Sequence, residues 1–180
     1  MKILKNHPII TKLGSSEITP ITSDWFNTAN VNISNAQILP DSGTISWGKV
    51  GMFGTVPVST DFEFEFTPKY MPTKSSDGFL VAGLSAQGSA AGYLNTLYAF
   101  YISIGTNINI YEGWVAKASN IGGGFTIGDI LKIKRVGTQI TYYKNNTLIY
   151  SSITPNSSAM DVSIDINRYL GTENNKITLN

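Results

Sequence analysis

The feature that most constrains the fold is a strict alternation of apolar and polar residues. In the segment 61–66 (DFEFEF), three phenylalanines would face one side of an extended chain and three acids the other. A period of two places alternate side chains on opposite faces of a strand, whereas an amphipathic helix needs a period near 3.6. No segment gives a persuasive amphipathic helix, so the chain is expected to fold mainly as β-strands.

Similar strand patterns recur along the chain. They are FLVAGLS at 79–85, LYAFYISI at 97–104, NINIY at 107–111, GDILKIKRVGTQITYYKNNTLIYSS at 128–152, MDVSIDI at 160–166 and KITL at 176–179. Within 128–152, Asn145-Asn146 supplies the positive-φ residues of a tight type I′ hairpin. Roughly a dozen short strands spaced about 8–12 residues apart predict an all-β, two-sheet antiparallel sandwich.

The predicted domain organisation is simple. A chain of 180 residues is enough for one domain and not comfortably for two. Residues 1–24 contain two prolines and scattered Ser and Thr without alternation, so we expect an extended N-terminal docking arm. Residues 25–180 are expected to form a single jelly-roll domain. The interrupted apolar run near the start predicts no cleavable signal peptide, and no segment is long and apolar enough to span a membrane.

Composition excludes several function classes. The chain has no cysteine and one histidine, His7, so thiolate metal sites, disulfides and histidine-rich metal sites are not expected. The formal net charge is +1, which gives no electrostatic footprint for nucleic acid or an anionic membrane. Only 14% of the residues are charged, and the polar surface must come largely from Asn, Ser and Thr.

The order of these strands and the block G-D-x-L-x-I-x-R-x-G-x-x-I-x-Y-Y-K-N-N-x-L-I-Y at 128–150 resemble the concanavalin A-like lectin/glucanase superfamily, in particular bacterial and phage-encoded modules. The resemblance covers about residues 44–180. It implies a two-sheet jelly roll, the fold of proteins that bind glycans, hydrolyse them, or act as structural and adhesive modules. Its motifs concern the fold, and function depends on sites placed upon a fold.

Asp61, Glu63 and Glu65 are the candidate catalytic carboxylates. Alternate positions on a strand lie about 6–7 Å apart on one face, while retaining glycosidases place two carboxyl groups about 5–5.5 Å apart. Laminarinase-like members of the superfamily carry an acid-x-Asp-x-acid pattern, but here Glu63 replaces the central aspartate and the flanking tryptophan motif is missing. A solvated strand face over a phenylalanine core explains the same pattern. We therefore predict no catalytic residue and keep hydrolysis as the alternative.

Candidate glycan-binding residues lie near turns. Sugars stack an apolar C–H face on flat rings while their hydroxyls pair with short polar side chains. This chemistry selects two groups, Tyr111, Glu112 and Trp114, and then Tyr93 and Asn95. Asp77, before Gly78, resembles the sugar-binding aspartate of legume-type lectins, although their metal-binding loop is not found here. Trp114 could equally cap the core.

No metal ion or cofactor is predicted. Asp161 and Asp165 share a strand face and could contribute to a calcium site, but two carboxylates fall short of the six to eight oxygen ligands that calcium takes. His7 precedes a proline in the arm and is expected to be a surface or packing residue.

These observations favour a non-enzymatic structural or adhesive module of a larger assembly. A phage virion component of the head, fibre or tail is the most economical setting, with other subunits bound through residues 1–24 and cell-surface glycan as a further partner. The expected location is a virion or an extracellular surface, and an oligomer is expected. The alternatives are a glycoside hydrolase using Glu63 and Glu65, and a free lectin.

Overall fold

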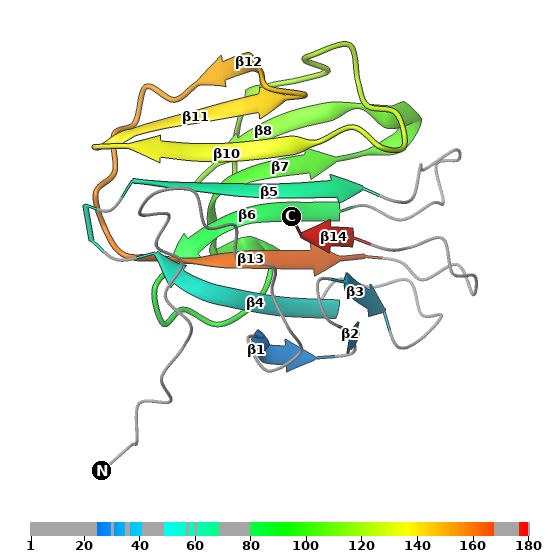
Figure 1. Cartoon of the computed structure of the whole chain (residues 1–180), viewed down its shortest axis with the longest axis vertical. Helices are drawn as coiled ribbons and strands as arrows, with labels where there is room; N and C mark the ends of the chain where they lie inside the picture. The colour runs from blue at the N-terminus through cyan, green and yellow to red at the C-terminus, as the bar shows by residue number, and fades with distance from the viewer. Residues whose placement is uncertain are drawn as a thin grey trace.

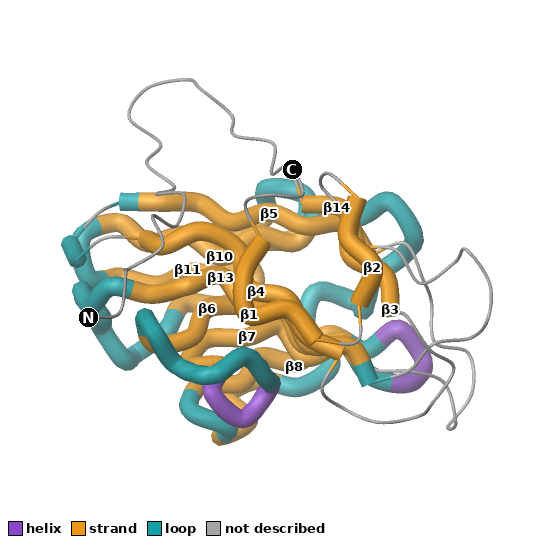
Figure 2. The backbone as a smooth tube through the Cα atoms, turned by 90° about the horizontal axis from the view of Figure 1, so that it is seen from below, coloured by secondary structure: helices purple, strands orange, loops and turns teal. Residues whose placement is uncertain are grey.

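A computed structural model describes residues 25–29, 31–34, 37–40, 49–56, 58–59, 61–68, 80–167 and 177–179. Within these ranges the chain forms two antiparallel sheets packed face to face, as Figures 1 and 2 show. The predicted all-β sandwich is confirmed. The proposed arm, with His7, lies outside the described residues.

Sheet A contains seven strands in the order β1-β4-β13-β6-β7-β8-β9. Their bounds are β1 Trp25–Ala29, β4 Lys49–Val56, β13 Met160–Ile166, β6 Leu80–Ala86, β7 Thr96–Ile102, β8 Ile108–Glu112 and β9 Val115–Ala118. Short 3-10 turns, η2 (Tyr93–Asn95) and η3 (Ile104–Thr106), precede β7 and β8. β13 lies in the interior of the sheet, where it pairs with β4 on one side and β6 on the other.

Sheet B also contains seven strands, in the order β12-β11-β10-β5-β14-β3-β2. Their bounds are β12 Thr147–Ser151, β11 Gln139–Lys144, β10 Leu131–Val136, β5 Phe62–Pro68, β14 Ile177–Leu179, β3 Gln37–Pro40 and β2 Val31–Ser34. β5 therefore lies between β10 and β14. The C-terminal strand thus joins the two halves of this sheet (Figure 1).

The β10–β11–β12 meander follows its sequence pattern closely. Asn145 and Asn146 connect β11 to β12 with φ of 49° and 63°, the left-handed values that a type I′ turn requires. Asp129, just before β10, accepts hydrogen bonds from the backbone N–H of Thr126 (2.7 Å) and from Asn145 Nδ2 (2.7 Å), and pairs with Lys144 (3.2 Å). Partial burial opposes ionisation of this carboxyl group, but these contacts outweigh it and hold its pKa at about 2.

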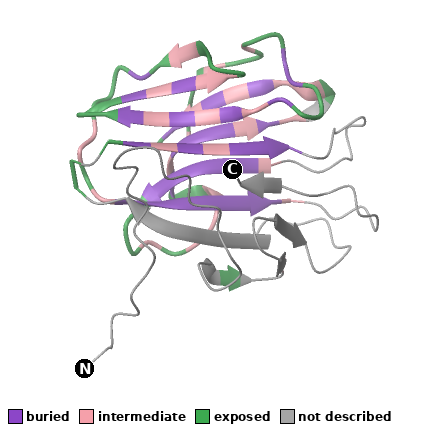
Figure 3. Cartoon of the chain, in the orientation of Figure 1, coloured by how far each residue is buried: buried purple, intermediate pink, exposed green. Residues whose placement is uncertain are grey.

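The core lies between the sheets, and its residues alternate with outward-facing ones as the sequence predicts (Figure 3). The buried cluster consists of Phe62, Phe64, Phe66, Ala82, Leu84, Tyr98, Phe100, Ile102, Ile108, Ile110, Phe125, Leu131, Ile133, Ile140, Tyr142, Met160, Val162, Ile164 and Ile166. Both sheets contribute, and aromatic rings meet across the layers: Phe66 and Phe100 lie 5.6 Å apart edge-to-face. We call the face of each sheet turned away from this core its outer face.

One glycine of sheet A is required by close backbone approach. A Cβ atom on Gly83 in β6 would lie 1.9 Å from the carbonyl oxygen of Tyr98 in β7. Next to it, the β6–β7 register shifts between Leu84 and Ser85. Only glycine fits this position, which fixes β7, the strand that leads into the candidate site.

Candidate glycan-binding site

The connection from β6 to β7 lies against the outer face of sheet A and is held by two buried aspartates of β13. Asp161 accepts a hydrogen bond from the backbone N–H of Gly88 (2.9 Å), and Asp165 accepts one from the backbone N–H of Tyr93 (2.8 Å). Both aspartates are buried, at 2% and 1% exposure. They do share a strand face, but in this structure their carboxylates fasten a loop. Within the described part of the chain, no three His, Cys, Asp or Glu side chains gather as a metal site would require.

Four aromatic side chains converge on the outer face of sheet A. We call Tyr93, Tyr101, Tyr111 and Trp114 the aromatic cluster. The Trp114 ring lies 4.8 Å from that of Tyr93, 5.4 Å from that of Tyr111 and 6.5 Å from that of Tyr101, in each case edge-to-face. Tyr101 and Tyr111 are 5.2 Å apart on neighbouring strands. All four side chains are partly exposed, so the cluster presents ring surface to solvent.

Trp114 occupies a backbone conformation that a bulky residue rarely adopts. Gly113 and Trp114 form the two-residue turn between β8 and β9, with φ of 55° and 62°, and Glu112 pairs with Val115 around it. Left-handed backbone costs a residue with a side chain about 1–2 kcal/mol, and Asn-Gly would be the usual solution. The buried indole N–H finds no hydrogen-bond acceptor among the described residues. Such strain and lack of pairing are typical of functional positions.

The predicted residues around the cluster have different positions. Asn95 is exposed in η2 and donates from Nδ2 to the carbonyl of Ala90 (2.9 Å), so it helps to shape the loop that carries Tyr93. Asp77 lies outside the described residues.

Tyr101 is a member of the aromatic cluster that the sequence analysis does not select. Its position was nevertheless readable, because Phe100 must face the core and the next residue must therefore face outward, beside Tyr111.

Glu112 does not join the aromatic cluster. Alternate residues of β8 face the core, and Glu112 comes two residues after Ile110 and four after Ile108. Its side chain therefore points inward, and the residue is only 6% exposed. Neither carboxylate oxygen has a hydrogen-bond partner among the residues the structure describes. Burial raises the pKa of Glu112, although the nearby Ser152 hydroxyl, the Lys117 charge and the Tyr142 hydroxyl act to lower it. Ser152 lies close but makes no hydrogen bond of good geometry with Glu112. Its hydroxyl donates to the Thr154 carbonyl (3.2 Å) instead.

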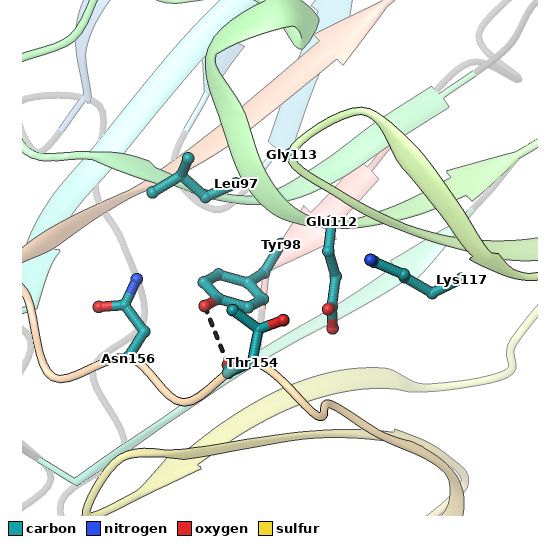
Figure 4. Close-up of a pocket in the computed structure, with 7 residues that line it drawn as sticks. All are labelled: Leu97, Tyr98, Glu112, Gly113, Lys117, Thr154 and Asn156. Carbon is teal, nitrogen blue, oxygen red and sulfur yellow. Dashed lines mark hydrogen bonds between the residues drawn. The ribbon is translucent and has the colours of Figure 1, made fainter.

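Glu112 lines a pocket at the end of the sandwich, next to the β8–β9 turn (Figure 4). The pocket has a volume of about 280 Å³ and is lined by Leu97, Tyr98, Glu112, Gly113, Lys117, Thr154 and Asn156. The Tyr98 hydroxyl donates to the Thr154 carbonyl (3.1 Å), which ties β7 to the β12–β13 connection. Gly113, Lys117 and Thr154 are exposed, so the pocket opens to solvent.

The candidate catalytic carboxylates lie on the outer face of sheet B. Glu63 pairs with Lys134 (2.9 Å) and Lys132 (3.3 Å), and Glu65 pairs with Lys132 (2.6 Å). We call these four residues the charged ladder. Partial burial would raise the pKa of Glu63, but the two lysines outweigh burial and hold it at about 2. Asp61 is exposed and accepts a hydrogen bond from the backbone N–H of Gly137 (2.6 Å).

Glu63 does not have the character of the general acid that glycoside hydrolysis needs. A general acid must hold a proton near neutral pH, which requires a raised pKa. Glu63 has the opposite shift, and Glu65 forms an ion pair with Lys132. The charged ladder therefore resembles the solvated strand face that the sequence pattern also allowed.

No known protein family matches the chain, and no curated protein matches it in sequence. Among the described residues, no helix is long and apolar enough to cross a membrane.

Solved structures do match the fold. The SPRY domain of human HERC1 has a TM-score of 0.62 at 14% identity, covering 84% of this chain and 92% of that one. The carbohydrate-binding module CBM66 from Bacillus subtilis has a TM-score of 0.55 at 10% identity, covering 96% of both chains. The carbohydrate recognition domain of Emp46p has a TM-score of 0.61 at 11% identity, covering 87% and 88%. Taken with the two-sheet topology, these matches show that the chain has the concanavalin A-like jelly-roll fold.

Proposed function

We propose that the chain is a non-enzymatic carbohydrate-binding module that holds glycan on the aromatic cluster. The observation that carries this proposal is the convergence of four partly exposed rings from η2, β7, β8 and the β8–β9 turn, with Trp114 held at φ 62°. A strained tryptophan adds nothing to a strand turn, which Asn-Gly would form more easily. A flat ring presented to solvent is, however, what the C–H face of a sugar packs against.

The fold matches support the proposal independently of the aromatic side chains. Two of the matched structures are a carbohydrate-binding module and a carbohydrate recognition domain.

The rigid positioning of the aromatic side chains also favours a binding role. Tyr93 is fixed by the bond from its backbone N–H to Asp165, while Tyr101 and Tyr111 sit on paired strands. A preorganised surface loses little conformational entropy when a ligand binds.

The hydrolase alternative is less well supported. It requires one member of the Glu63–Glu65 pair to be protonated near neutral pH, and the paired lysines favour the ionised form of Glu63. Incubation of the protein with oligosaccharides that it binds should leave them intact. Release of reducing ends that is lost in Glu63→Gln would establish the enzyme instead.

Glycan-array binding of the full chain, compared with Trp114→Ala and Tyr111→Ala, tests the proposal. Central aromatic residues of a binding surface contribute about 2 kcal/mol or more, so Trp114→Ala should weaken binding roughly 30-fold or more. Lys134→Gln, in the charged ladder on the opposite face, is the control and should bind as the natural chain does. Equal binding by Trp114→Ala, with its fold verified by circular dichroism, would refute the proposal.

The assembly role stays a prediction from the sequence. We propose that residues 1–24 connect the module to other subunits, with a phage particle as the most economical setting. Light scattering on the full chain and on a form that starts at Trp25 tests it. An assembly formed only by the full chain supports a docking arm, whereas monomers in both cases contradict it.

A further inference from the structure

The pocket lined by Glu112, called here the Glu112 pocket, is a site separate from the aromatic cluster. An ionised carboxylate offers about four acceptor positions, and burying it without donors is costly. Here neither oxygen has a hydrogen bond of good geometry in the described part of the molecule, although the hydroxyls of Tyr142 and Ser152 lie nearby, and Glu112 lines an open pocket. The missing donors can therefore come from a molecule that enters the pocket.

The walls of this pocket are held in place from several sides. The Thr154 backbone N–H donates to the Ser152 hydroxyl (3.0 Å), and its carbonyl accepts from Tyr98. The Asn156 backbone N–H donates to the carbonyl of Thr138 (2.8 Å). On the opposite side, the Gly113 backbone N–H donates to the carbonyl of Leu97 (2.9 Å). These hydrogen bonds tie β7 to the β8–β9 turn and to the β12–β13 connection, and tie that connection to the turn between β10 and β11.

The lining selects the chemistry of the ligand. Leu97 and the ring of Tyr98 provide apolar surface, Glu112 accepts hydrogen bonds, and the Asn156 amide can both donate and accept. Lys117 extends toward Glu112 without forming an ion pair with it among the described contacts, and its charge disfavours a cationic ligand (Figure 4). A neutral molecule with adjacent hydroxyl groups and a C–H face satisfies all of these groups.

Size and position narrow the ligand further. A volume of about 280 Å³ lies just below the range of small-molecule pockets, about 300–1,000 Å³, so there is room for one sugar unit rather than several. Gly113 lines the pocket, and the next residue, Trp114, belongs to the aromatic cluster. The two sites therefore adjoin at a single turn.

We infer that the Glu112 pocket holds one neutral sugar unit, whose adjacent hydroxyls donate to the Glu112 carboxylate, at the end of a glycan that lies on the aromatic cluster. This inference rests on the proposed glycan-binding function. It assigns the turn between β8 and β9 to both parts of one binding surface. It also explains why an unpaired acid occupies a position that an apolar residue would fill at lower cost.

Backbone-amide NMR on the full chain tests the inference. The probes are the methyl pyranosides of glucose, galactose and mannose at millimolar concentration, with ethylammonium as the cationic comparison. We expect a glycoside to shift the amides of Gly113, Lys117 and Asn156. Glu112→Gln should weaken this binding about tenfold or more, whereas Glu65→Gln, a matched change in the charged ladder, should not. Acidification toward the raised pKa of Glu112 should weaken binding in the natural chain but not in Glu112→Gln.

The variants separate this inference from the proposed function. Trp114→Ala should lose oligosaccharide binding while a monosaccharide still shifts the pocket amides. The inference is overturned if no glycoside shifts those amides, if Glu112→Gln binds as well as the natural chain, or if ethylammonium binds in place of the sugars. In these cases the proposed function still stands when Trp114→Ala abolishes binding to the array.

A stability measurement distinguishes ligand binding by Glu112 from a purely structural role of this residue. Glu112→Gln should raise the Tm at neutral pH, because it removes a buried charge that has no partner. A lower Tm would show that Glu112 is an acceptor for the Tyr142 and Ser152 hydroxyls in the folded protein. That result would overturn the inference.

Discussion

The outer faces of the two sheets differ in how fully their groups are paired. On sheet B, every member of the charged ladder has an opposite charge within 3.3 Å on the neighbouring strand. On sheet A, the aromatic cluster contains a tryptophan at positive φ whose buried N–H has no described partner. The first face is locally satisfied, and the second is locally strained.

The difference in pairing between the two outer faces indicates where a functional site lies in a chain whose sequence motifs mainly concern its fold. Groups that complete one another stabilise the sheet and leave nothing for a ligand to supply. Groups that break local rules persist only where the surrounding structure compensates for them, and they are concentrated at functional sites. Carboxylates attract attention in a sequence, but among the described residues the paired ones stabilise the fold, and Glu112, which has no hydrogen bond of good geometry, lines a pocket.

The largest effect on stability is expected from removing both cations of the ladder. Lys132→Gln together with Lys134→Gln leaves Glu63 and Glu65 partly buried without the lysines that balance their charges, which should cost about 2 kcal/mol of unfolding free energy. Urea unfolding measures the loss, and glycan binding should be unchanged. If binding falls with stability intact, the comparison between the two faces fails.

Opposite pH responses sharpen the comparison. The folded pKa of Glu63 is depressed from 4.5 to about 2, so its contribution is complete above pH 4.5 and is lost as the pH falls toward 2. It amounts to roughly 1–2 kcal/mol after allowance for screening at its exposed edge. Glu112 has a raised pKa, so ionising it lowers stability as the pH rises above 4.5.

Thermal unfolding across pH 2–7 for the natural chain, Glu63→Gln and Glu112→Gln separates these two responses. Glu63→Gln should flatten the acid limb, although Asp129, whose pKa is also about 2, will keep part of it. Glu112→Gln should remove the loss of stability that ionisation of Glu112 causes as the pH rises above 4.5. Identical curves for all three proteins would contradict both assignments.

The smallest effect concerns the turn itself. Trp114→Gly and Trp114→Ala both remove the indole, so their difference isolates the backbone. Glycine adopts positive φ freely, and the glycine variant should therefore be more stable by about 1 kcal/mol. Chemical denaturation of the two variants measures it. Equal stability would mean that the turn relaxes and that Trp114 is not strained.

Much of the fold could be predicted because the alternation of apolar and polar residues determines which side chains of each strand face the core. Phe62, Phe64 and Phe66 are buried as expected, and the turn at Asn145-Asn146 has the predicted backbone. Parity also determines the direction of Glu112, since Ile108 and Ile110 face the core. Grouping Glu112 with Tyr111 overlooked this, because adjacent strand residues face opposite sides.

The assembly of the site was less predictable from sequence. Tyr93 lies near Trp114 because Asp161 and Asp165, about 70 residues further along the chain, fasten the β6–β7 connection. No local pattern encodes which backbone N–H a distant carboxylate will accept. Pairing of Glu63 with Lys134 likewise depends on the β5–β10 register, which only the folded sheet fixes.

The positions of β13 and β14 also bear on how the protein is made. β13 inserts between β4 and β6, and β14 inserts between β5 and β3, so both sheets remain incomplete until residues 160–179 have left the ribosome. During translation the nascent chain therefore presents unpaired edges of β5 and β6, which are open to pairing with other chains. Folding is expected to follow synthesis, and efficient production depends on keeping those edges apart until the last strands arrive.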